Sequence, residues 1–210
     1  MVINRILTDT DRGIYAPVID MFQKYIPMTG HKIQDAIVQQ AFVYQTAKEL
    51  SPINPRILSA GSYQDIAAEL LRYDGYAVYD VDPVMNYDLH TFRKLVNPPS
   101  RLYDTIISTS VLEHTTDDSE FVDDICALLK PSGYGILTMD YKNDYVPGDP
   151  VPYTSNRFYT MFDLTERLNS ILTDNDCRLL LYDYSGHDRF IWDNIQYSFS
   201  TFVFKKDTNA

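Results

Sequence analysis

The sequence predicts an α/β protein built on a doubly wound, mostly parallel β-sheet. The first observation is residues 56–82, RILSAGSYQDIAAELLRYDGYAVYDVD, which give a strand, a glycine turn, a helix and a strand closed by Asp82. The second observation is that β-branched, apolar runs typical of buried strands recur at 103–109 and 134–141. A helical pattern separates these two runs, and alternating strands and helices are typical of parallel sheets with helices on both faces.

Two helices are expected before the first of these strands. Residues 13–27 carry apolar side chains at helical spacing, and residues 32–50 repeat the pattern until Ser51-Pro52 interrupt it. Each helix has one apolar stripe, so each needs another surface against which to bury it. We expect residues 1–54 either to cover the edge of the sheet or to form a lid over its binding site.

The segment after Asp82 gives weaker patterns. A short third strand is expected over 86–89 and a loop over 97–100. An irregular, proline-containing segment covers 142–160, and a loop of that length is usually functional or mobile. The rest of the chain is expected to contain helices over 117–130 and 163–173, a turn over 130–133, and strands over 177–184 and 196–204.

Length, charge and cysteine content limit the classes of protein that fit. The chain has 210 residues, enough for a single domain over 1–210 with its core in 55–205. A net charge of −11 argues against nucleic acid as a partner. No apolar run approaches the roughly 18 residues of a membrane span, and residues 1–13 do not read as a signal peptide. Cys126 and Cys177 are expected to be reduced core residues of a cytoplasmic protein.

The glycine turn indicates which cofactor the fold binds. Dinucleotides need a pyrophosphate cradle with three glycines, but here only Gly61 is present and Tyr63 takes the second glycine position. S-adenosylmethionine (SAM) has no phosphate and needs one close backbone approach and an acid for its ribose. Asp82, which lies 21 residues after Gly61, supplies that acid, with Asp80 as its rival on the same face. This pattern favours SAM over NAD.

The order of motifs resembles that of the class I SAM-dependent methyltransferases. ILSAGS is similar to their first motif, VYDVDP to the second, YDTIISTSVLEHTTDD to the fourth-strand motif, and LLKPSGYGILTMDY to the fifth-strand motif. The resemblance covers about 55–205 and implies a Rossmann-like, seven-stranded sheet with six parallel strands and an antiparallel last strand. Three positions depart from the family pattern, and one of them is Ser132, which replaces a glycine in the turn before the fifth strand. Ser59 replaces an acid that often orders the methionine ammonium through water, and Tyr63 replaces a glycine.

The resemblance also implies the site residues. Asp82 would bind the ribose, Asp88 the exocyclic amine of adenine, and Leu89 the face of the ring. Asp140, at the end of the fifth strand, and His114, which closes the LEH motif, are the candidates for a catalytic base, although a structural role for His114 fits equally well. No metal site is apparent. The complete set expected at the cofactor is Ser59, Ala60, Gly61, Ser62, Asp82, Pro83, Asp88, Leu89, Ser108, Thr109 and Ser110.

The methyl acceptor is expected to be a polar small molecule, most plausibly a sugar or a sugar-derived metabolite methylated on oxygen. Hydroxyl and carboxylate groups end the central strands, and tyrosines with polar tips follow them. The candidate substrate-binding residues are Tyr141, Arg157, Tyr159 and His187, with Arg189 as a further anion-binding group. The pattern implies no membrane partner and leaves the oligomeric state open.

Other functions remain open at this point. The chain could methylate nitrogen or another metabolite, or it could be a non-catalytic SAM-binding subunit that acts through a partner. Amino-methylases of DNA carry a [DN]PPY motif after the fourth strand. Residues 97–100, NPPS, precede that strand and lack the aromatic residue, so we interpret them as a plain loop.

Overall fold

The computed structural model describes residues 2–31, 33–96, 102–187 and 190–208, so the loop expected at 97–100 and Arg189 lie outside the described residues. The described residues form one nine-stranded sheet whose main path has the order β3-β2-β4-β5-β9-β1-β7, while β6 and β8 each pair with β9. The strands are β1 (Asn4–Leu7), β2 (Arg56–Ala60), β3 (Ala77–Val81), β4 (Tyr103–Thr109), β5 (Leu129–Tyr141), β6 (Cys177–Leu179), β7 (Tyr182–Asp183), β8 (Phe190–Trp192) and β9 (Ile195–Lys206).

The expected α/β fold with a mostly parallel sheet is confirmed. β3, β2, β4 and β5 pair in parallel, and β9 runs antiparallel to β5. β1 is antiparallel to β9 and parallel to β7, so six strands of the main path share one direction and β9 alone opposes them. The carboxyl ends of β2, β3 and β4 therefore meet at one edge of the sheet, where α/β folds bind their ligands.

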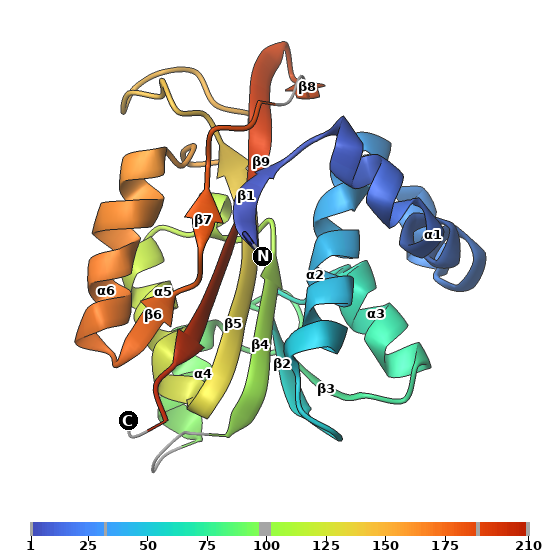
Figure 1. Ribbon diagram of the computed structural model, residues 1–210, viewed down its shortest axis with the longest axis vertical. Helices are drawn as coiled ribbons and strands as arrows, with labels where there is room; N and C mark the ends of the chain where they lie inside the picture. Colours follow the sequence, from blue (N-terminus) through green and yellow to red (C-terminus); the bar gives the residue numbers. More distant parts are fainter. Residues whose placement is uncertain (1, 32, 97–101, 188–189, 209–210) are drawn as a thin grey trace.

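Helices cover both faces of the sheet (Figure 1). On one face lie α1 (Asp9–Tyr25), α2 (Ile37–Leu50) and α3 (Ile66–Tyr73); on the other lie α4 (Leu89–Leu95), α5 (Asp118–Leu128) and α6 (Leu168–Asp174). Adjacent residues of a strand point to opposite faces, so Ile57 joins the core under α2 while Leu58 joins the core under α5. α2 is buried over most of its length, which makes it part of the core.

Several local predictions were wrong. β1 was not expected, because four residues carry no local signal and its partner strand lies at the other end of the sequence. α1 begins at Asp9 instead of residue 13, because Thr8 and Asp11 form a capping box. No strand forms over 86–89: Asp88 is the N-cap of α4. The expected strand over 177–184 is divided into β6 and β7.

The turn expected over 130–133 is also different. These residues continue β5, but the pairing with β4 shifts between Tyr103 and Thr105, whose partners are Leu129 and Tyr134. The extra residues on β5 form a bulge, and Ser132 adopts a positive φ of 66° within it. A single turn of π-helix, Asp163–Arg167, leads into α6, so the helix expected over 163–173 is confirmed with an irregular start.

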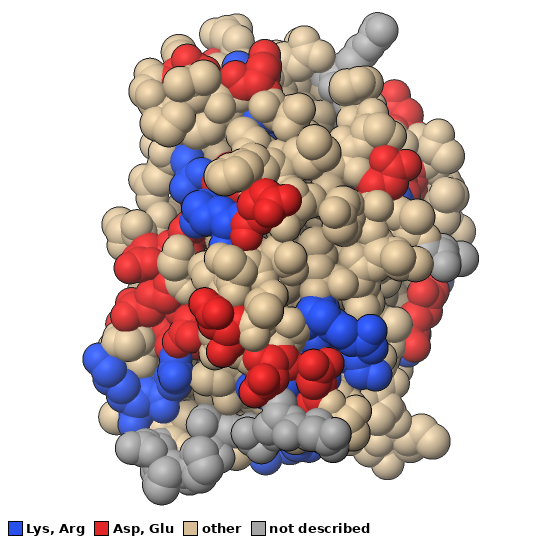
Figure 2. All heavy atoms as spheres, turned by 60° about the vertical axis from the view of Figure 1, so that its left-hand side comes forward, with Lys and Arg blue, Asp and Glu red and all other residues tan. Residues whose placement is uncertain are grey.

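Other composition-based expectations concern the core and the surface. Cys126 and Cys177 are both free and buried, as expected. In the described part of the chain, no helix has the length and apolar character needed to cross a membrane. Figure 2 shows Lys and Arg side chains in small groups among Asp and Glu on the face bearing α5 and α6, with no continuous basic surface on that face.

Candidate cofactor site

A cavity of about 850 Å³ lies at the carboxyl ends of β2, β3 and β4. Its walls come from the turn after β2, the loop after β3, the end of β4, and the nearby parts of α2, α4 and α5. Of the residues that the sequence predicted at the cofactor, those that line the cavity are Gly61, Asp82, Pro83, Asp88, Leu89, Thr109 and Ser110. The parallel strands thus bring together positions that are far apart in the sequence.

Gly61 allows the turn after β2 to pass close to the segment after β4. Its φ is +79°, a conformation that favours glycine, and a Cβ at this position would collide with the side chain of Val111. Its N–H donates to the carbonyl of Val81 at 2.8 Å, which ties the turn to the end of β3. The backbone at Gly61 is therefore accessible to a ligand, with no side chain in the way.

Asp82 is held in place by the backbone around it. Its Oδ1 accepts a hydrogen bond from Val84 N at 2.8 Å, and its Oδ2 accepts one from Tyr63 N at 3.1 Å. A carboxylate oxygen has two lone pairs, so each oxygen can also accept a hydroxyl from a ribose. The rival Asp80 forms an ion pair with Arg72 and is not among the residues that line the cavity.

One end of the cavity combines apolar surface with acids that already have partners. Val84, Leu89 and Phe121 supply the apolar wall. Asp88 caps α4, accepting from Thr91 N and Thr91 Oγ1, both at 2.8 Å. These hydrogen bonds, the backbone one foremost, lower the pKa of Asp88. Further along the wall, Asp124 pairs with Arg93 at 2.7 Å and lies 3.2 Å from His90 Nδ1.

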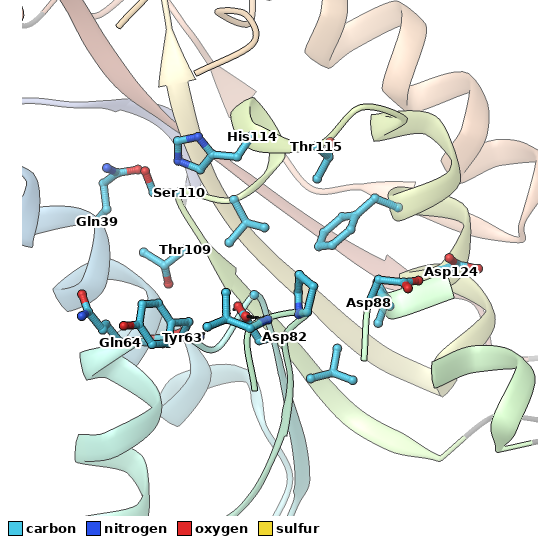
Figure 3. Close-up of a pocket in the computed structure, with 18 of the residues that line it drawn as sticks. Gln39, Tyr63, Gln64, Asp82, Asp88, Thr109, Ser110, His114, Thr115 and Asp124 are labelled. Atoms are coloured by element: carbon cyan, nitrogen blue, oxygen red, sulfur yellow. Dashed lines mark hydrogen bonds between the residues drawn. The ribbon is translucent and has the colours of Figure 1, made fainter. Parts of the chain in front are cut away.

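The opposite end gathers Gln39, Thr109, Ser110 and His114 (Figure 3). Ser110 has a positive φ of 57°, and its hydroxyl donates to Glu113 Oε1 at 2.6 Å. His114 Nδ1 lies 2.6 Å from the carbonyl of Thr154. A carbonyl can only accept, so Nδ1 carries the proton and Nε2 of the neutral ring keeps its lone pair. This geometry is suitable for a general base.

Behind Ser110 lies a pair of buried carboxyl groups, Glu113 and Asp140. Glu113 is fully buried, and no hydrogen-bond donor among the described residues reaches its Oε2. Burial raises the pKa of Glu113, and burial together with the adjacent Glu113 carboxylate raises the pKa of Asp140. Asp140 does not line the cavity, so its predicted role as the base would require transfer of the proton through other groups.

The remaining predicted cofactor residues support the cavity from behind. Ala60 and Ser108 are buried in their strands, and Ser62 donates to Met85 Sδ at 3.6 Å. Ser59, in the position of the family's acid, donates to Asp65 Oδ2 at 3.0 Å. Asp65 itself lines the cavity and caps α3, so a carboxylate is present near the place where the sequence lacked one.

The predicted substrate residues divide into two groups. Tyr141 and His187 line a second cavity of about 1160 Å³, together with Tyr182, Tyr184 and Tyr197. Arg157 and Tyr159 line neither cavity. Arg157 pairs with Asp163 at 2.7 Å, and the buried Tyr159 hydroxyl donates to Asp118 at 2.8 Å.

Sequence reasoning missed Gln39, Gln64 and Val111, which also line the cavity. Gln64 has a positive φ of 60° and follows the glycine turn directly. Gln39 carries no signal of its own in the sequence, because Gln40 beside it is equally polar and only the packing of α2 separates their roles. Val111 is set opposite Gly61, a contact that only the fold reveals.

The sequence of the chain is similar to those of known proteins. A family profile described as a methyltransferase domain matches residues 30–182. The mitochondrial ubiquinone biosynthesis O-methyltransferase of Homo sapiens is 24% identical over 148 residues, which are 61% of this chain. The match spans only 38% of the length of that relative.

Solved structures share the fold. TehB from Haemophilus influenzae has a TM-score of 0.57 at 19% identity, covering 89% of this chain and 65% of that one. The 1,6-didemethyltoxoflavin-N1-methyltransferase of Burkholderia thailandensis, with 1,6-didemethyltoxoflavin and S-adenosylhomocysteine bound, has a TM-score of 0.55 at 13% identity, covering 92% and 87%. Both the topology and the position of the cavity agree with such a fold.

Proposed function

The chain belongs to the methyltransferase-domain family, and we propose that it transfers the methyl group of SAM to an oxygen atom of a polar small molecule. The observation that carries this proposal is the placement of Asp82 between an apolar end and a polar end of one cavity (Figure 3). The volume of about 850 Å³ is within the range of roughly 300–1,000 Å³ typical of ligand pockets.

The cavity matches the three parts of the cofactor in order. Val84, Leu89 and Phe121 provide an apolar wall for the purine. Asp82 provides acceptors for the ribose hydroxyls, and the glycine turn leaves space for the amino-acid end. Pro83 lies beside Asp82 in the same wall. In this arrangement the reactive methyl group would lie near Ser110 and His114.

When bound, the cofactor supplies a methyl group on a positively charged sulfur. The protein must then orient the acceptor and remove its proton. With the Nδ1 hydrogen bonded to Thr154, His114 Nε2 is the nitrogen that would take that proton as the new oxygen–carbon bond forms. The carbonyl of Thr154 stabilises the resulting imidazolium, because it already accepts the hydrogen bond from Nδ1.

We propose a sugar hydroxyl as the acceptor. The second cavity supports this choice, because its tyrosine rings can stack on a sugar and its polar groups can bond to hydroxyls. Tyr141 stacks on Tyr184 with ring centroids 6.2 Å apart, and Tyr184 stacks on Tyr182 at 5.7 Å. His187, at the rim of the same cavity, adds a polar contact.

Calorimetry with S-adenosylhomocysteine tests the cofactor site. Asp82→Asn should weaken binding about tenfold or more, because the charged acceptor for the ribose is lost. Asp80→Asn is the matched control on the same strand and should leave the affinity unchanged, since Asp80 pairs with Arg72 instead. Equal affinities in the two variants would refute the ribose assignment.

A methyl-transfer screen tests the reaction. Radiolabelled SAM is offered with sugars, nucleotide sugars, phenols and amines, and His114→Asn serves as the variant without the base. We expect methylation of a sugar that falls at least about a hundredfold in His114→Asn. Transfer to an amine or phenol alone would replace the proposed acceptor class, and full activity in His114→Asn would remove that residue from the mechanism.

A further inference from the structure

Two buried polar atoms at the same end of the cavity have no hydrogen-bond partner among the described residues. They are Gln39 Oε1, from α2, and Thr109 Oγ1, at the end of β4. Gln39 is 2% exposed and Thr109 is 7% exposed, and both line the cavity. Figure 3 shows the two side chains at the end occupied by Ser110 and His114. Unpaired buried polar groups destabilise a fold, so both positions require an explanation.

The neighbouring glutamine shows that the local helix geometry is not the cause. Gln40 is also buried in α2, and its Oε1 accepts a hydrogen bond from Ala67 N at 2.8 Å. That bond pairs one of the free N–H groups at the start of α3. Both glutamines line the cavity, but Gln40 Oε1 has a partner there and Gln39 Oε1 has none among the described residues.

The part of the cofactor expected at this end of the cavity contains a group that can satisfy these atoms. With the ribose at Asp82 and the purine at the Leu89 end, the amino-acid end would lie beside Gln39. That end carries an ammonium, which only donates hydrogen bonds, and a carboxylate, which only accepts them. The carbonyl oxygen of Gln39 only accepts as well, so it matches the ammonium and not the carboxylate.

The charges nearby agree with a bound cation. Asp65 lines the same cavity and is 3% exposed, and its carboxylate accepts from Ser59 at 3.0 Å. A buried carboxylate attracts a positive group across a low-dielectric site much more strongly than it would in water. Among the described residues that line the cavity there is no Lys or Arg.

We propose that Gln39 and Thr109 bind the α-ammonium of the cofactor's amino-acid end, so that α2 determines recognition of that end. This inference rests on the proposed function, since it assigns residues to the same cofactor. Gln39 and Thr109 remain unpaired in the free protein because their partner arrives with the ligand.

The first test separates this role from a structural one. Gln39→Met and Thr109→Val keep the shape of each side chain and remove the unpaired polar atom. Each variant should raise the melting temperature by about 2–4 °C and weaken S-adenosylhomocysteine binding about tenfold, measured by calorimetry. Gln40→Met, the matched control, should instead lower the melting temperature, because Ala67 N loses one of its two acceptors and keeps only Asp65 Oδ1 at 3.0 Å. A lower melting temperature in Gln39→Met, or unchanged affinity, would overturn the proposal.

The second test varies the ligand. S-(5′-adenosyl)-4-thiobutyrate has the structure of S-adenosylhomocysteine without the amino group. The wild-type protein should bind it about tenfold less tightly than S-adenosylhomocysteine. In Gln39→Met the difference in affinity between the two ligands should become smaller, because only Thr109 and Asp65 remain near the ammonium. If Gln39→Met weakens both ligands by the same factor, Gln39 does not contact the ammonium. Failure of the wild-type protein to bind S-adenosylhomocysteine at all would refute the proposed function as well, which distinguishes the two results.

Discussion

Two groups of buried acids lie next to each other in this molecule, and their surroundings are opposite. Asp118 and Asp163 are surrounded by Arg157 and Arg167. Burial alone would raise the pKa of each acid, but hydrogen bonds from Arg167 and the other partners lower both pKa values. No arginine among the described residues pairs with Glu113 or Asp140, and burial raises the pKa of both carboxyl groups.

The difference separates structural acids from acids connected to the site. The first group fastens the segment before α6 to the start of α5: Arg167 Nη1 and Nη2 each donate to Asp118 at 2.8 Å. The second group lies behind Ser110, which lines the cavity. A carboxyl pair without a cation is costly for the fold, and such perturbed groups are typical of functional sites.

The largest effect is expected from removing Asp118. Asp118→Ala would leave Nη1 and Nη2 of Arg167 without the carboxylate to which they donate. The Tyr159 hydroxyl, which donates to Asp118 at 2.8 Å, would keep only the carbonyl of Leu112 at 3.1 Å as an acceptor. We expect the free energy of unfolding to fall by about 3 kcal/mol, measured by urea denaturation. Glu166→Ala, at an exposed position on the adjacent π-turn, is the control and should change it by less than about 0.5 kcal/mol. Similar losses in both variants would contradict a structural role for the arginine network.

The second prediction is a change in the pH dependence of stability. Glu113 has a raised pKa in the folded state, so the unfolded chain ionises first as the pH rises and the folded state loses stability above about pH 4.5. Glu113→Gln removes this loss, keeps an acceptor for Ser110, and can donate to Asp140. The variant should therefore match the wild-type protein near pH 4 and exceed it at pH 7 by about 1 kcal/mol or more.

The acids that pair with arginine change the stability in the opposite direction as the pH varies. Asp118 and Asp163 have lowered pKa values, so their contribution is present above about pH 4 and is lost as the pH falls through the folded-state values. Urea denaturation at a series of pH values between 3 and 8 measures both the loss of stability at low pH and the loss at higher pH. A constant difference between Glu113→Gln and wild type across this range would show that Glu113 does not titrate as proposed. The polar and titratable groups that face Glu113 and Asp140 are Ser110, His114, Ser155, Tyr159 and Tyr197.

The smallest effect is expected from substituting Asp88, an acid whose hydrogen bonds come from the first turn of its own helix. Its carboxylate has no cation and is satisfied by Thr91 N and Thr91 Oγ1. Asparagine is an equally good N-cap, so Asp88→Asn should change the free energy of unfolding by less than about 0.5 kcal/mol. If Asp88 also binds the exocyclic amine of adenine, S-adenosylhomocysteine should bind roughly threefold more weakly. Unchanged affinity would leave Asp88 with a capping role alone.

Much of the fold was predictable because its signals are local. The segment 56–82 forms β2, α3 and β3 as expected, and β4 has the expected bounds of 103–109. The strand expected over 86–89 does not form, because Asp88 caps α4 by accepting a hydrogen bond from Thr91 N. β1 was not predictable: its four residues become a strand through pairing with β7 and β9, which lie far away in the sequence.

The site followed the same rule. Gly61, Asp82, Thr109 and Ser110 were predictable because each ends a strand of the parallel sheet, and the topology brings those ends together. Gln39 was not, since its position depends on how α2 packs on the sheet. Arg157 and Tyr159 were predicted to bind substrate because a loop residue with a polar tip looks the same in an ion network as in a pocket.

The pairing of β1 with β9 has a consequence for the order in which the chain can fold as it is synthesised. The side-chain amide of Asn4 bonds to both backbone groups of Val203, 199 residues later in the sequence. β2 to β5 can pair with one another as soon as they emerge, but the outer edge of β5 stays open until β9 is complete. For most of that interval β1 has no strand to join, because its other partner, β7, is made only shortly before β9. An open edge is a site for misassociation between nascent chains. The last strand to be made therefore closes the edge of β5 and, in the same step, gives the first strand its place.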